Sequence, residues 1–268
     1  MNLKCLVLLA VGVVVWLRPY AEGQTVITMG TASSYGALAG VSVTNTGATT
    51  INGNLGVSAA TTPTGFPPGV LNGTLNVGNA AATQAVADAQ AAYNVVQGEA
   101  ATQILTGSDL GSRVLTPGVY FFATSAQLTG GLTLDAGNTV GARFDFQIGS
   151  TLTTAAGSSV SLIHGAAAGN VYWQVGTSAT LGTGTVFSGN VLADQSITMN
   201  SGSTLSGTAA AINASVTLDS NTITASPGGA GPAVPEPATT ALLMAGAVGL
   251  FVLATRFRRP GPVQADCS

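Results

Sequence analysis

The segment Gln195-Ser-Ile-Thr-Met-Asn-Ser-Gly-Ser-Thr-Leu205 shows the pattern that decides the fold of this chain. Apolar and hydroxyl side chains alternate at Ile197, Thr198 and Met199, which is typical of a β-strand with one buried and one exposed face. Gly202 then stands where the chain must turn, because glycine adopts a positive φ at little steric cost. We therefore interpret this segment as one short strand followed by a corner.

The same pattern recurs in the C-terminal half and predicts stacked coils. The aligned segments are residues 150–160, 177–187, 195–205 and 214–224. Their aligned threonines are separated by 27, 18 and 19 residues, which is about one solenoid coil with an occasional loop insertion. These threonines are Thr153, Thr180, Thr198 and Thr217. Residues 41–57 form a similar segment in the N-terminal half, so we expect a β-solenoid built from both halves.

Residues 79–105, between the two halves, predict one helix. This segment is rich in alanine and free of proline, and its small or apolar residues recur at helical spacing from Ala81 to Ala100. A helix with an alanine face can approach a sheet closely. We expect it to lie along one side of the solenoid and to cover that side.

Charged residues are scarce, which excludes several classes of partner. They make up 6% of the chain, against about 25% in ordinary globular proteins. Between Gly30 and Gly231 there is no lysine, and the basic residues are Arg113 and Arg143 alone, so a nucleic-acid-binding surface is not expected. The two cysteines fall in the terminal segments, so the predicted domain contains no disulfide and is expected to fold as a monomer.

The inventory of reactive residues argues against an enzyme. His164 is the only histidine, and it is interpreted as a loop or capping residue. No Gly-x-Ser-x-Gly or Gly-x-x-x-x-Gly-Lys segment occurs, and no metal site or cofactor is predicted. The carboxylates that a glycosidase or lyase would need are spread along the chain, although the fold could still bring them together. They are Asp135, Asp145, Asp194 and Asp219.

The N-terminal segment, residues 1–23, predicts a signal peptide. Lys4 precedes a short apolar run, and small residues after it offer cleavage points. The run is too short to favour a membrane span.

The C-terminal segment resembles a PEP-CTERM sorting signal. A glycine- and proline-rich linker, residues 226–233, leads to Pro235-Glu236-Pro237, which opens a predicted signal at 234–259 with a transmembrane segment at 238–254. Residues 260–268 form a short tail. The resemblance implies a bacterial protein that passes through the membrane, is processed by an exosortase-type enzyme, and is secreted or anchored at the cell surface. A plain transmembrane anchor with basic residues inside is the alternative.

Several segments of the middle region resemble the microbial ice-binding (antifreeze) protein family, in the family's order and spacing over about residues 28–224. They are residues 37–47, 54–58, 64–69, 115–120, 146–152, 171–176 and 218–224. The resemblance implies a mainly β fold for residues 24–225: a right-handed, discontinuous β-solenoid of triangular cross-section with one long α-helix packed alongside. It also implies that one flat, uncovered side adsorbs to an ice crystal surface.

Some members of that family carry a Thr-(Ala/Gly)-x-(Thr/Asn) pattern on the ice-contacting side. Residues 46–49 fit this pattern fully, residues 201–204 fit it with serine first, and residues 183–186 keep the first threonine only. By resemblance, the predicted ice-binding residues are Thr46, Thr49, Thr183, Thr185, Ser201, Ser203 and Thr204.

Hydroxyl rows on a solenoid have a physical reason to bind ice. Coils stack about 4.8 Å apart and alternate residues of a strand lie about 6.6 Å apart, so one side presents a two-dimensional lattice. Threonine has a restricted χ1 and loses little entropy on binding. Two alternatives remain open. Outward threonines also satisfy β-propensity in any solenoid, and the C-terminal signal alone would suit a surface-anchored adhesin or biofilm-matrix protein without ice activity.

Overall fold

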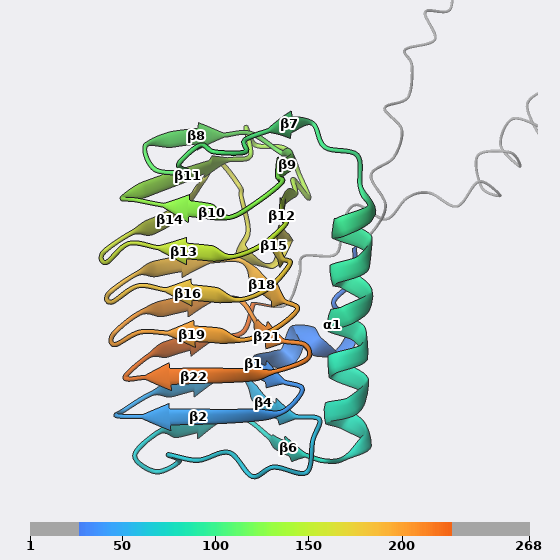
Figure 1. Ribbon diagram of the computed structural model, residues 1–268, viewed down its shortest axis with the longest axis vertical. Coiled ribbons are helices and arrows are strands. Elements are labelled where there is room, and N and C mark those ends of the chain that lie inside the picture. The colour runs from blue at the N-terminus through green and yellow to red at the C-terminus, as the bar shows by residue number, and fades with distance from the viewer. Residues whose placement is uncertain (1–26, 227–268) are drawn as a thin grey trace, which may run out of the picture.

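The computed structural model describes residues 27–226, which form a parallel β-solenoid with one long helix alongside (Figure 1). Three parallel sheets, named A, B and C, form its sides. A complete coil runs through a strand of sheet B, then one of sheet C, then one of sheet A. The predicted mainly β solenoid with a single long α-helix is confirmed.

Within each sheet, neighbouring strands come from neighbouring coils. Sheet A consists of β6 (Leu75–Val77), β4 (Asn54–Val57), β1 (Tyr35–Ala39), β21 (Ala209–Ala211), β18 (Asn190–Ala193), β15 (Val171–Val175), β12 (Phe144–Ile148), β9 (Gly118–Phe122) and β7 (Gln103–Ile104). Sheet B consists of β10 (Ala126–Leu128), β13 (Leu152–Thr154), β16 (Ala179–Leu181), β19 (Ile197–Met199), β22 (Ser215–Asp219) and β2 (Ser42–Thr46). Sheet C consists of β5 (Val70–Asn72), β3 (Thr50–Asn52), β23 (Thr222–Thr224), β20 (Thr204–Ser206), β17 (Val186–Ser188), β14 (Ser159–Ile163), β11 (Gly131–Asp135) and β8 (Arg113–Leu115). Two 3₁₀ helices, η1 (Gly30–Ser34) and η2 (Ala168–Asn170), precede β1 and β15.

The solenoid is discontinuous in sequence. Strands β1 to β6 form the coils at one end of the solenoid, and helix α1 then leads to the other end (Figure 1). From there the later strands add coils in the reverse direction until β22 and β23 pair with β2 and β3. Strand β1 pairs with β21, as Ala37 opposite Ala209 shows, and so supplies the sheet A strand of the last coil. The N-terminal strand therefore closes the C-terminal coil, and this closure lies wholly within residues 27–226.

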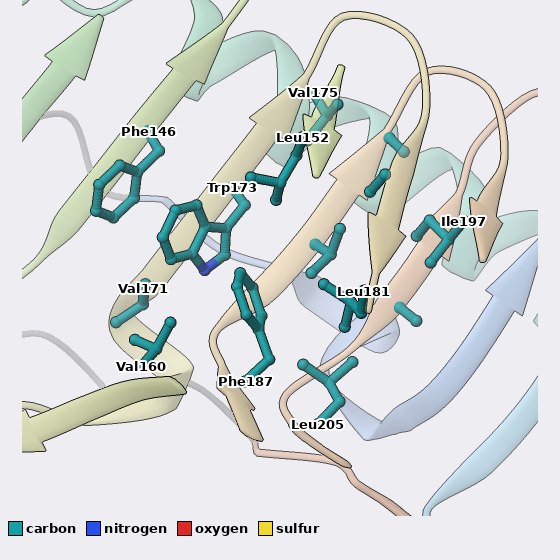
Figure 2. Close-up of a cluster of buried hydrophobic side chains, with 14 of the residues drawn as sticks. Phe146, Leu152, Val160, Val171, Trp173, Val175, Leu181, Phe187, Ile197 and Leu205 are labelled. Atoms are coloured by element: carbon teal, nitrogen blue, oxygen red, sulfur yellow. The ribbon is translucent and has the colours of Figure 1, made fainter. Parts of the chain in front are cut away.

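Alternate strand residues fill a continuous apolar interior. An aromatic stack runs through its upper half: ring centroids of Tyr120 and Phe146 are 5.3 Å apart, Phe146 and Trp173 3.8 Å, and Trp173 and Phe187 4.8 Å. Figure 2 shows the last three of these rings among the surrounding aliphatic side chains. The Trp173 indole N–H donates to the carbonyl of Ser188 at 3.0 Å, which satisfies the polar atom that this buried ring brings into the core.

Helix α1 (Ala80–Gly98) covers the outer face of sheet A. Asn79 caps its first turn by accepting a hydrogen bond from the N–H of Ala82 at 2.9 Å. The small side chains of its inner face let it pack closely on apolar residues of sheet A. The buried helix residues are Ala82, Ala85, Ala89, Ala92, Tyr93 and Val96, and the apolar sheet A residues in the same cluster include Leu38, Tyr172, Leu192 and Ala210. The predicted position of the helix is thus confirmed.

The predicted end of the helix at residue 105 is wrong. The helix ends at Gly98, and Gln103–Ile104 form strand β7, which pairs with β9. Glycine weakens a helix, and the side chain of the next residue, Glu99, is drawn into a buried ion pair with Arg143. Tertiary contacts therefore override the alanine-rich pattern at this end.

Arg143 lies in a buried ionic cluster that fastens the C-terminal end of α1 to sheet A. Its Nε donates to Asp145 Oδ2 at 2.7 Å, and its Nη2 pairs with Glu99 Oε2. Gln147 donates from Nε2 to the carbonyls of Val96 and Glu99, both at 2.7 Å. Asp145 is fully buried, and this burial raises its pKa from 3.8 to about 8, with a hydrogen bond to Glu99 acting in the same direction.

In residues 27–226, no helix is long and apolar enough to cross a membrane. The predicted signal peptide at 1–23, the transmembrane segment at 238–254 and the tail at 260–268 lie outside the described residues, as does the linker beyond Ser226.

Candidate functional site

Sheets B and C are the two sides of the solenoid that the helix leaves uncovered. All residues of the sheet A strands β12 and β15 are buried, because the core covers one face and α1 the other. In sheet B the strands keep an alternating pattern, with buried residues on either side of a more exposed one. A surface that contacts a large external partner must therefore lie on sheet B or sheet C.

Sheet B carries a single row of threonines along its middle. Thr153, Thr180, Thr198, Thr217 and Thr44 are consecutive partners in register on five neighbouring strands. At its two ends the row continues through Gln127 on β10 and through Thr64, which forms an isolated bridge with Thr44. We call these residues the central row. Figure 1 shows the strands that carry it stacked in one column.

A second row of hydroxyls runs beside the central row, two residues earlier on each coil. This flanking row consists of Ser125, Thr151, Ser178, Ser196, Ser215 and Ser42. At the two ends of this row, hydroxyls bond to one another across coils: Thr151 donates to Ser125 at 3.0 Å, and the Ser42 and Ser215 oxygens are 2.8 Å apart. These bonds orient the four hydroxyls that make them.

Neither row contains a charged side chain, and the central row is regular over five coils. With coils about 4.8 Å apart and rows about 6.6 Å apart, sheet B presents a two-dimensional lattice of neutral hydroxyl groups. Sheet C is less uniform, because exposed valines interrupt its hydroxyls at Val70, Val114 and Val186. Strand β14 of sheet C also ends at a turn, because the next residue, His164, has a positive φ of 49°.

Three of the seven residues predicted to contact ice are buried, which corrects that assignment. Thr49, Thr185 and Ser203 have 0% exposed surface, so their side chains cannot touch an external surface. They point inward at the corner between sheets B and C, where they bond to the backbone and side chains of neighbouring coils. Asn221 Nδ2 donates to Ser203 Oγ at 2.9 Å, and the Asn221 N–H donates to Thr49 Oγ1 at 3.0 Å.

The other four predicted residues are accessible but do not share one side. Thr46 is exposed at the end of β2 on sheet B, and Thr204 is half-buried on sheet C. Thr183 and Ser201 are exposed in the turns between the two sheets. The central row was visible in the sequence as the aligned threonines of the repeats, yet the family pattern directed the assignment to the corners.

Replacing Thr185 with valine is expected to lower the free energy of unfolding by about 1–2 kcal/mol, since one buried hydrogen bond has a net value of about 1 kcal/mol. The shape is conserved, but the Thr185 hydroxyl loses its 2.8 Å bond to Thr154 Oγ1 and its 3.3 Å bond to the carbonyl of Ala155. Urea denaturation measures the change, with the exposed Thr183→Val as control, for which a change within about 0.5 kcal/mol is expected. Equal stability of both variants and the native chain would show that the corner hydroxyls are not structural.

The fold and its surface together define a class: a discontinuous β-solenoid in which a helix covers one sheet while another presents an ordered lattice of uncharged hydroxyls. Residues 37–224 match the family model described as Ice-binding-like, and the chain belongs to this family. Residues 233–259 match the PEP-CTERM protein-sorting motif, which confirms the predicted sorting signal and marks the protein for export to the outside or surface of a bacterial cell.

The chain is similar to known ice-binding proteins over most of its length. An ice-binding protein of Nostoc sp. (strain HG1) is 45% identical over 265 residues, covering 96% of this chain and 98% of the relative. The crystal structure of an ice-binding protein from the Antarctic ascomycete Antarctomyces psychrotrophicus aligns with a TM-score of 0.72 and 43% identity, covering 75% of this chain and 98% of that one. The crystal structure of an ice-binding protein from an Antarctic biological consortium aligns with a TM-score of 0.73 and 46% identity, covering 76% of this chain and 93% of that one.

The two solved chains are almost fully covered, although their alignments span only three quarters of this chain. The solved relatives therefore consist of little more than the solenoid. The coil pairing of this chain likewise closes inside residues 27–226.

Proposed function

We propose that this protein is an ice-binding, antifreeze protein that adsorbs to ice through sheet B, with the central and flanking rows as the contact surface. The observation that carries the proposal is the register of Thr153, Thr180, Thr198, Thr217 and Thr44, which aligns one methyl and one hydroxyl per coil on an uncovered sheet. Adsorbed molecules would inhibit ice growth and recrystallisation.

The chemistry of the two rows suits an ordered-water surface. Threonine is stiff at χ1, so its methyl and hydroxyl keep their positions with little entropy left to lose on binding. A charged side chain would hold its own hydration shell, and both rows are free of charge. At the two ends of the flanking row, neighbouring hydroxyls already bond to each other, which limits the number of ways in which they can order water.

Catalysis is not part of the proposed function. The four aspartates that could have converged lie apart: Asp145 is buried beneath α1, and Asp135 pairs with His164 at 2.8 Å. Asp194 accepts from a neighbouring amide, and Asp219 stands at the end of β22. No group of three or more metal-ligating side chains occurs among residues 27–226. We further propose that the solenoid acts as a monomer without metal, and that a membrane-embedded precursor is the substrate of an exosortase-type enzyme.

The purified segment 24–226 is expected to adsorb to a growing ice crystal and to inhibit recrystallisation, without releasing sugar from polysaccharides. A fluorescent derivative frozen slowly into an ice hemisphere measures the adsorption, and a reducing-sugar assay on pectin and alginate measures hydrolysis. Exclusion of the segment from ice to the same extent as a non-binding protein would contradict the proposal. Sugar release that a single Asp→Asn change abolishes would establish an enzyme instead.

A further inference from the structure

The C-terminal end of the described domain lies at the corner between sheets A and C, beside the point where the chain enters β1. The last residues follow β23 of sheet C: the Ala225 N–H donates to the carbonyl of Asn52 at 2.9 Å, and Ser226 Oγ is 3.0 Å from Ser206 Oγ. The first residues enter β1 of sheet A from the same corner. A side chain at Gly53 would collide there with both Ala225 and the backbone N of Gly36.

The fold leaves the chain no other exit. After β23 each coil would continue into a sheet A strand, but β1 already fills that position between β21 and β4. The chain must therefore leave the solenoid at the corner instead of crossing sheet A. In a cross-section of three sides, the corner shared by sheets A and C lies opposite sheet B.

We infer that the protein binds ice while it is still attached to the cell, with the cell envelope and the ice on opposite sides of the solenoid. This inference rests on the proposed function of sheet B. From Ser226 to Pro235 the chain has nine residues, which can span at most about 30 Å when fully extended. The solenoid is thus held near the envelope by the A–C corner, and the hydroxyl rows face outward.

The proposed partner is therefore an ice crystal to which a whole cell adheres. The protein then serves as an ice adhesin of the cell surface. If the C-terminal chain left the solenoid from sheet B, it would cover the rows that contact ice. An anchor at the A–C corner covers neither row, so adsorption and attachment do not compete.

The test attaches the segment 24–226 to beads through single cysteines. This segment contains no cysteine, because the two in the chain are Cys5 and Cys267. Ser226→Cys places the attachment at the natural exit, Thr198→Cys places it in the central row, and Thr133→Cys places it on sheet C. Beads with equal protein loading are then presented to a growing ice crystal.

Beads coupled through Ser226→Cys are expected to be captured by ice as fully as those coupled through Thr133→Cys, whereas coupling through Thr198→Cys abolishes capture. If uncoupled segment adsorbs to ice but Ser226→Cys beads do not, the tethered role is overturned while ice binding stands. If uncoupled segment also fails to adsorb, the proposed function itself fails. Capture of Thr198→Cys beads equal to the others would overturn the orientation of the rows.

Discussion

Replacing Thr198 with tyrosine is expected to remove most of the thermal hysteresis, the gap between melting and freezing temperatures that adsorbed protein produces. Thr198 lies in the middle of the central row, directly between Thr180 and Thr217 in register. A tyrosine ring at this position would stand above the neighbouring methyl and hydroxyl groups and hold the lattice away from ice. Because the side chain points out of the core, the free energy of unfolding should change by no more than about 0.5 kcal/mol.

Thr198→Ser is the matched control for this prediction, because it keeps the hydroxyl and removes only the methyl. We expect it to retain part of the hysteresis, with a melting temperature like that of the native segment. Hysteresis and thermal unfolding should be measured on the same preparations. Full hysteresis in Thr198→Tyr would mean that ice is contacted elsewhere, and a collapsed melting temperature would mean that the residue is structural.

The largest effect on stability is expected from Arg143→Met. This change leaves the carboxyl groups of Asp145 and Glu99 buried without their cation, and removal of one partner from a buried ion pair costs about 3–5 kcal/mol. The full loss is expected at pH 9, above the raised pKa of Asp145, where its carboxyl group is ionised. At pH 5 the loss should be smaller, because Asp145 lies below its raised pKa there and carries no charge.

The titration of Asp145 gives this prediction its pH dependence. Its pKa in the folded protein is raised from 3.8 to about 8, chiefly by burial, so the folded state binds the proton more tightly than the unfolded state. The stability that this proton contributes is fully present below pH 4 and is lost as the pH rises to about 8. The buried Asp145 Oδ1 has no hydrogen-bond partner among the described residues, so ionisation of this carboxyl group in the folded state is unfavourable.

Thermal unfolding of the native segment between pH 5 and pH 9 measures this contribution. The melting temperature should fall across the interval, and Asp145→Asn, which has the shape of the protonated acid, should remove the part of the fall that Asp145 causes. The carboxyl groups of Asp88, Asp109 and Asp135, which are half-buried or exposed, have lowered pKa values, so their effect is confined to more acidic solutions. A pH dependence unchanged in Asp145→Asn would contradict the assignment.

The sequence predicted the fold well because the repeats are local patterns. Alternation of apolar and hydroxyl residues specified which side chains face the core, and the spacing of the aligned threonines specified coils. The end of α1 could not be predicted, because Glu99 is fixed by Arg143, which lies just before β12 and 44 residues later in the chain. That contact exists only after the solenoid has brought the two together.

The contact surface was predicted less well, for a physical reason. A hydroxyl at a corner and one on a strand look alike in sequence, but burial separates them: Thr185 bonds inward to Thr154, whereas Thr180 faces outward. Buried hydroxyls recur at this corner, at Thr49, Thr185 and Ser203, and they bond to polar groups of neighbouring coils. Only the register between coils distinguishes this structural column from the outward row that the aligned threonines form.

One comparison tests most directly whether sheet B is the ice-contacting side. Thr217 and Thr222 are exposed threonines of the same coil, one on β22 of sheet B and the other on β23 of sheet C. Each is replaced by lysine, and the thermal hysteresis of the two variants is measured at equal concentration. We predict that Thr217→Lys loses most of the hysteresis and that Thr222→Lys keeps it. Loss in Thr222→Lys with full hysteresis in Thr217→Lys would assign ice binding to sheet C and contradict this account.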